Sequence, residues 1–146
     1  MAEKFKLQTV LDYRTTLEEQ AQQALAVSQQ QQQELAAAIA TQQQELNDQD
    51  QALKQRQEEG LTIAEIEIYE SRINHCRHLT VQLQAQLLGL EKKIVKQRET
   101  LLKAARDRQV MDKLKERQEA EFRREQERKE RIQLDEISLR NKGTMP

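Results

Sequence analysis

The sequence predicts an all-α protein, in which two long helices form an antiparallel coiled-coil hairpin and the second overhangs as a charged single helix. Among the 146 residues, 34% are charged and only 36% hydrophobic, and the one proline is the last residue. Such a composition is typical of long helices. Positions that would face a partner helix, which we call the seam, recur at steps of three and four residues. This spacing indicates coiled-coil packing. This spacing breaks once, at Gly60, and resumes in another register, so it predicts two helices.

The first helix is expected over about residues 4–58. Two seam positions per heptad bury a stripe instead of a broad core, so this helix needs a partner helix. Several seam positions are polar, which predicts a helix that is marginally stable or has a second partner. The seam consists of Leu7, Leu11, Arg14, Glu18, Ala21, Leu25, Ser28, Gln32, Leu35, Ile39, Gln42, Leu46, Gln49 and Leu53.

A turn is expected over about residues 59–62, where the register changes. Gly60 suits the left-handed residue that ends a helix. Thr62, with Glu65 three residues later, has the spacing of a capping box that opens the next helix. These signals predict a tight reversal of the chain.

The second helix is expected over about residues 63–140, followed by a frayed tail over 141–146, and the whole chain is expected to form one domain. A turn centred near residue 60 places Leu7 beside Lys113, so residues after Lys113 lack a first-helix partner. Fifteen of the twenty residues in Asp112–Arg131 are charged, which predicts a solvated single helix. The second seam consists of Ile66, Tyr69, Ile73, Cys76, Thr80, Leu83, Leu87, Leu90, Ile94, Gln97, Leu101 and Ala104.

Signatures of enzymes and metal sites are missing from the sequence. The three glycines are dispersed, and none belongs to a phosphate-binding loop. His75, Cys76 and His78 are metal-capable, but Cys76 faces the seam while the histidines flank it, so the three should not converge. We therefore expect no catalysis, no cofactor and no metal.

The membrane and nucleic-acid classes are also disfavoured. No apolar run approaches the roughly 20 residues of a membrane span, and the single cysteine excludes an internal disulfide. These features favour a soluble cytoplasmic protein without direct membrane insertion. Lys92–Arg108 carries seven basic and two acidic residues, but it has no interleaved aromatics for stacking on bases. We interpret it as balancing Asp12, Glu18 and Glu19 on the facing helix; docking to an acidic surface or to nucleic acid is the alternative.

Three passages together resemble the FliJ family of flagellar export proteins. They lie in the same order as in the family and extend over nearly the whole chain. They are Phe5-Lys-Leu-Gln-Thr-Val-Leu-Asp-Tyr-Arg14 with Glu18–Glu19, then Ile68-Tyr69-x-x-x-Ile73, and finally Lys113-Leu-Lys-Glu-Arg117 with Glu121-Phe122 and Leu134-Asp135-Glu136.

The resemblance implies a non-enzymatic coiled coil of the bacterial flagellar type III export apparatus. Such proteins resemble the central stalk subunit of rotary ATPases. The implied partners are the hexameric export ATPase FliI, the cytoplasmic domain of the export gate protein FlhA, and export chaperones. The implied location is the cytoplasmic face of the inner membrane at the flagellar base.

The resemblance also implies two groups of contact residues, although coiled-coil packing is the simpler explanation for those on the seam. The gate group would lie near the turn and comprises Leu46, Gln49, Leu53, Tyr69, Ile73 and Cys76. The ring group would lie at the opposite end and comprises Phe5, Leu7, Leu11, Arg14, Arg117 and Phe122.

Three other functions stay open at this point. A stalk of a virulence-type III secretion system would have nearly the same sequence features. A generic coiled-coil spacer or dimeriser would share the heptads without an ATPase partner. A nucleic-acid binder would depend on Lys92–Arg108 alone.

Overall fold

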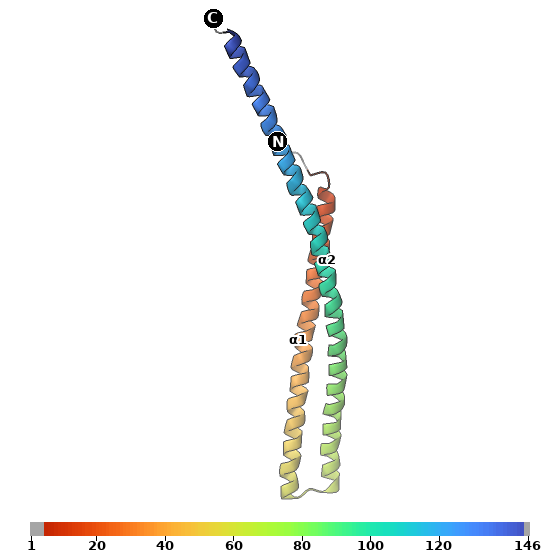
Figure 1. The fold of residues 1–146 in the computed structure, drawn as a ribbon. Coiled ribbons are helices and arrows are strands. Elements are labelled where there is room, and N and C mark those ends of the chain that lie inside the picture. Colours follow the sequence, from red (N-terminus) through yellow and green to blue (C-terminus); the bar gives the residue numbers. More distant parts are fainter. Residues whose placement is uncertain (1–4, 145–146) are drawn as a thin grey trace. The chain divides into compact units, whose positions relative to one another are not determined.

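Two helices account for nearly all of the described residues. The structure is a computed structural model and describes residues 5–144. Helix α1 spans Gln8–Glu59 and α2 spans Ile63–Thr144; the described residues contain no strand. The helices run in opposite directions from a short connection (Figure 1). This confirms the predicted all-α antiparallel hairpin.

Contacts divide the chain into two units. The first unit joins residues 1–20 to residues 101–146, and the second contains residues 21–100. Both helices continue through both units, but a two-helix coil buries only local layers of side chains. Contacts therefore group by segment, and the single domain stays a prediction.

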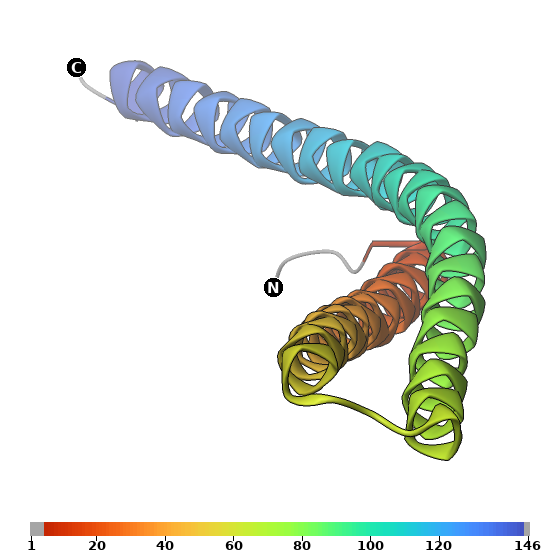
Figure 2. The ribbon, with the colours of Figure 1, turned by 90° about the horizontal axis from the view of Figure 1, so that it is seen from below.

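The connection between the helices lies in the second unit (Figure 2). Gly60 has φ +95°, a conformation that side-chain-bearing residues rarely adopt, so glycine suits the end of α1. The Thr62 hydroxyl accepts a hydrogen bond from the Glu65 amide at 3.2 Å, which caps the start of α2. The Glu65 carboxylate instead lies 3.3 Å from the Arg56 guanidinium, so it ties the two helix ends together.

In the second unit, every predicted seam position is buried or half-buried. The most buried are Ser28, Ile39, Ile73, Cys76, Thr80 and Ile94. Ser28 is only 1% exposed, and its small side chain lets the two helices approach closely. The Thr80 hydroxyl donates to the Cys76 carbonyl at 2.7 Å, so its burial leaves no unpaired donor.

In the first unit, the seam of α2 continues past Ala104, the last seam residue that the sequence predicted. Met111 is 4% exposed and Leu11 on α1 is 6% exposed. Arg108, Lys115, Gln118 and Phe122 are half-buried at the same three- and four-residue steps. The covered part of α2 therefore ends near Phe122, and the expected end near Lys113 was wrong.

The N-terminal segment explains why α2 is covered farther along than expected. The amide of Gln8 donates to the Phe5 carbonyl at 3.1 Å, and the amide of Leu11 donates to the Leu7 carbonyl at 3.0 Å. Helix α1 thus begins at Gln8, later than the expected start near residue 4. Residues 5–7 form a turn before it. Phe5 and Leu7 of this segment line one notch with residues of α2 beyond Lys113.

Beyond the covered part, α2 continues as a solvated helix. Every residue from Arg123 to Gly143 is exposed; we call this segment the arm. The helix extends to Thr144, so residues 141–144 are helical where a frayed tail was expected. No proline interrupts the arm before Pro146, which accounts for the longer helix; residues 145–146 lie outside the described residues.

Candidate functional site

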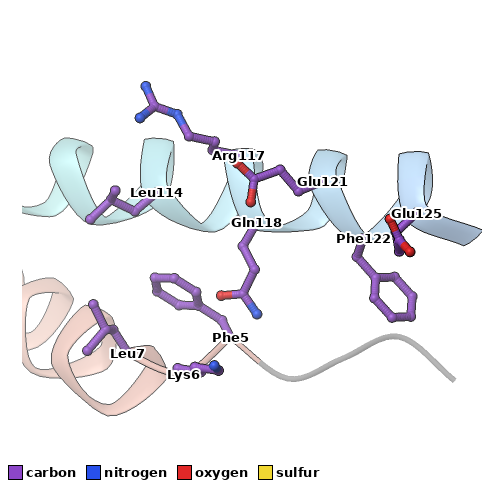
Figure 3. A pocket seen from close by; sticks show the side chains of 9 residues that line it. All are labelled: Phe5, Lys6, Leu7, Leu114, Arg117, Gln118, Glu121, Phe122 and Glu125. Carbon is purple, nitrogen blue, oxygen red and sulfur yellow. The ribbon is translucent and has the colours of Figure 1, made fainter.

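Four residues of the ring group line one pocket in the first unit. Phe5 and Leu7 contribute from the N-terminal segment, and Arg117 and Phe122 contribute from α2. The pocket is an open notch of about 730 Å³ that Leu114 completes on its apolar side, with Glu121 and Glu125 at its edge. Figure 3 shows the rings of Phe5 and Phe122 on the same side of α2, whereas Arg117 points away from them. The fold therefore brings these four residues together as an apolar notch with charged edges.

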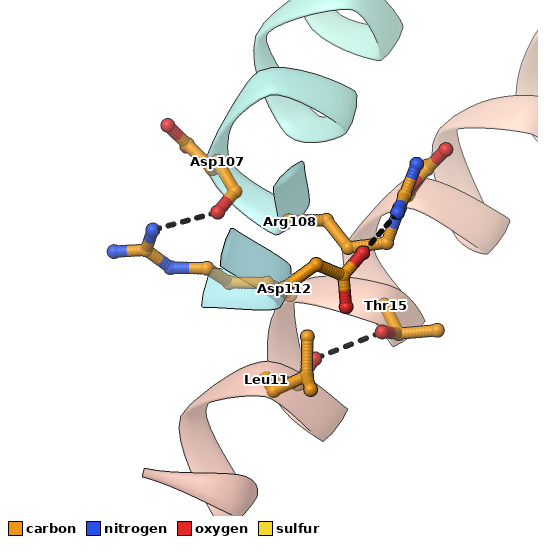
Figure 4. Close-up of polar contacts among 7 residues, drawn as sticks. Leu11, Thr15, Asp107, Arg108 and Asp112 are labelled. Carbon is orange, nitrogen blue, oxygen red and sulfur yellow. Dashed lines mark hydrogen bonds and ion pairs between the residues drawn. The ribbon is translucent and has the colours of Figure 1, made fainter. Parts of the chain in front are cut away.

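The other two members of the ring group pack the hairpin. Leu11 is buried, and its carbonyl accepts a hydrogen bond from the Thr15 hydroxyl at 2.9 Å (Figure 4). The Arg14 guanidinium donates to the Asp107 carbonyl of α2 at 2.9 Å. This bond joins residues 93 positions apart, so Arg14 fixes the register of α1 on α2 instead of facing solvent.

Arg108 was expected to balance the acids of α1, but its place on the seam was not predicted; there it forms an ion-pair cluster beside Arg14. Arg108 pairs with Glu18 across the seam, and its guanidinium lies 2.5 Å from Asp112 on its own helix (Figure 4). The hydrogen bond that Arg108 donates to Glu18 raises the pKa of Arg108; burial opposes the rise, and Asp112 adds to it. The signal was present in the sequence, because Arg108 lies four residues after Ala104 in the same register.

The gate group lies in the second unit and is largely covered. Ile73 and Cys76 are each 6% exposed, and Leu46, Gln49, Leu53 and Tyr69 are half-buried. These side chains pack the two helices against each other. A partner in this region would meet the flanking residues first, unless the seam opens.

A second notch, of about 700 Å³, lies beside these residues. Its lining is mainly polar and consists of Gln42, Glu45, Gln49, Ser71, Arg72, His75, Cys76 and Leu79. The side-chain oxygen of Gln49 is buried without a hydrogen-bond partner, as is that of Gln97 farther along the seam. An unpaired buried amide oxygen costs free energy, so the seam near Gln49 is a weak point of the hairpin.

Among the residues that the structure describes, no group of three histidine, cysteine or acidic side chains could hold a metal ion; Cys76 is buried and forms no disulfide. Within Lys92–Arg108, Arg108 alone pairs with the facing helix. The other basic residues are exposed and form no ion pair among the described residues. The interpretation that this stretch balances the acids of α1 therefore holds for Arg108 only.

The part of the chain that the structure describes contains no helix long and apolar enough to cross a membrane. Neither the curated proteins nor the solved structures yield a match to the chain. A protein-family model does match, the one described as the flagellar FliJ protein, and the match extends over residues 3–143. It includes α1, the connection, the covered part of α2 and the arm. The chain therefore belongs to the FliJ family, whose members are components of flagellar protein export.

Proposed function

We propose that this protein is a non-enzymatic stalk of the flagellar type III export apparatus, which binds the hexameric export ATPase FliI. The observation that carries the proposal is the family match over residues 3–143. The arm supports it, because every residue of Arg123–Gly143 is exposed and so accessible to a surrounding partner. Oppositely charged residues three or four positions apart, such as Glu125 and Arg128, help to keep such a helix formed.

The ring group supplies the proposed ATPase contact. The notch of Phe5, Leu7, Arg117 and Phe122 lies where the covered part of α2 gives way to the arm. Half-buried aromatic side chains beside charged edges are typical anchors of protein interfaces. Leu11 and Arg14 would contribute indirectly, by holding α1 in register with α2.

The gate group supplies the proposed contact with the cytoplasmic domain of FlhA. Because Ile73 and Cys76 are buried, this contact would use the flanking side chains or a local opening near Gln49. Export chaperones would be served by the same complex. The protein would be cytoplasmic and would associate peripherally with the membrane at the flagellar base.

The test is to mix the full chain with the cognate ATPase and to measure ring formation and ATP hydrolysis. We expect both to increase. Arg117→Glu should lower the stimulation at least tenfold, because this exposed residue reverses its charge without loss of packing. The control Arg72→Glu makes the same change beside the gate group and should retain the stimulation.

The gate contact is tested with the same two variants and the isolated FlhA cytoplasmic domain. Arg72→Glu should weaken that binding and Arg117→Glu should not. Absence of any effect of the wild-type chain on the ATPase, at every stoichiometry, would refute the stalk role. It would leave a generic coiled-coil spacer as the better description.

A further inference from the structure

An exposed apolar face on the first unit has no partner within the described residues. On α1 it comprises Val10, Tyr13 and Leu17, and on α2 it comprises Val110 and Leu114. Tyr13 is 63% exposed and Val110 is 52% exposed. We call these five residues the outer face. They are separate from the seam, whose most buried members here are Leu11 and Met111.

The five residues lie on one side of the helix pair. Val10 and Leu17 each precede a seam residue of α1, and Leu114 precedes the half-buried Lys115 of α2. In an antiparallel coiled coil, such positions flank the seam on the same side. The bond from Arg14 to the Asp107 carbonyl sets the register, which places Val10 level with Met111 and within about one turn of Leu114. The partial cover of Val10 and Leu114, with 37% and 39% exposed, is consistent with this placement.

The spacing of the outer face matches what another helix would need. Val10, Tyr13 and Leu17 follow one another at steps of three and four residues, which repeats the heptad pattern on a second side of α1. The groove between two helices, lined from both sides by apolar residues, accepts the apolar face of a third.

A basic rim borders this face on α2. It consists of Lys103, Arg106, Lys113 and Arg117, all exposed. None of the four forms an ion pair within the part of the chain that the structure describes. The acidic residues on the same side are Asp107 and Glu121, so the rim has a net charge of about +2. Along α1, Thr9, Thr16 and Gln20 leave the other border uncharged.

We propose that the outer face binds an acidic amphipathic helix of a partner protein as a third strand of the coiled coil. The outer face would contact the apolar face of that helix, and the basic rim would form ion pairs with the acidic residues beside that face. A second copy of this chain fits less well, because a symmetric contact would bring two basic rims together.

The probe is a synthetic three-heptad peptide with leucine at its seam positions and glutamate on its flanks. Binding to the full chain is followed by fluorescence anisotropy. The double variant Tyr13→Ser with Val110→Ser should weaken binding at least tenfold. The matched control, Val81→Ser with Leu88→Ser, removes similarly exposed residues from α2 elsewhere and should bind like the wild type.

The rim is tested separately. Arg106→Glu with Lys113→Glu should weaken binding at least tenfold. The control, Lys92→Glu with Lys93→Glu, makes the same charge change earlier in α2, away from the rim, and should bind like the wild type. Binding should also weaken as salt rises, because exposed charges are screened. Circular dichroism verifies that each variant keeps its helix content.

Several results would overturn the proposal. One is equal binding of a peptide with the same composition but scrambled leucine positions. Another is equal loss in the test and control variants. Self-association that Tyr13→Ser abolishes, or preferential binding to vesicles of anionic lipid, would assign the face to a different occupant. The proposal does not rest on the stalk role: a chain that binds the peptide without stimulating the ATPase refutes only the proposed function.

Discussion

Within the first unit, the covered part of α2, Leu101–Phe122, and the arm, Arg123–Gly143, belong to one helix and are both rich in charge, yet their surroundings differ. The covered part places Met111 at 4% exposure and gives Arg108 two carboxylate partners. In the arm every side chain is exposed, and the apolar residues Ile132, Leu134, Ile137 and Leu139 follow no single stripe. Charge density therefore does not decide which part of α2 packs against α1. A few residues at seam positions decide it.

The largest expected effect comes from Met111→Ala, which empties the most buried position of the covered part. Large-to-small changes at buried sites cost about 2–4 kcal/mol, so the free energy of unfolding should fall by that amount in urea titrations followed by circular dichroism. Val110→Ala, at the exposed neighbouring position, is the control and should cost well under half as much. Equal losses would mean that Met111 does not pack against α1.

A smaller loss is expected from Phe122→Ala, where the covered part ends. Phe122 is half-buried, so the loss should be about 1–2 kcal/mol. Ile132→Ala in the arm is the control and should leave the unfolding free energy unchanged. A comparable loss at Ile132 would show that the arm is covered as well.

Glu18→Gln tests the ion-pair cluster and should destabilise less than either change above. It removes the carboxylate that Arg108 meets across the seam while it keeps the side-chain shape. The difference from wild type should shrink in high salt, because the pair is partly exposed to solvent. Glu19→Gln, one residue away and exposed, is the matched control. A salt-independent difference would indicate lost packing instead of a lost ion pair.

The smallest effect should be a pH dependence in the arm. The hydrogen bond from Arg128 lowers the pKa of Glu125 below its ordinary 4.5. A lowered carboxyl pKa stabilises the helix at neutral pH, and this contribution is lost as the pH falls below 4.5 through the lowered pKa. Carbon chemical shifts near Arg128 should report less helix at low pH, and Glu125→Gln should reduce this change. An unchanged pH profile in the variant would contradict the assignment to this pair.

The sequence predicted the hairpin because the steps of three and four residues and the turn signals around Gly60 are local features. It ended the second seam too early, at Ala104, because Arg108 and Lys115 occupy seam positions with charged side chains that resemble a solvated face. It could not show that residues 5–7 form a turn before α1 and cover α2 as far as Phe122. The ring and gate groups were drawn from a resemblance, and a seam residue has the same pattern whether it packs the hairpin or contacts a partner. Cys76 illustrates this, since its burial satisfies the heptad alone.

Hydrogen exchange of the backbone amides along α2 tests the central claim, that one continuous helix changes from covered to bare at Phe122. The amides of Leu101–Phe122 should exchange slowly because opening them breaks the seam, whereas those of Arg123–Gly143 should exchange fast because an isolated helix is marginal in water. A sharp fall in protection at Phe122 is the result we expect. Protection that continues undiminished to Leu139, or that is lost before Met111, would contradict it.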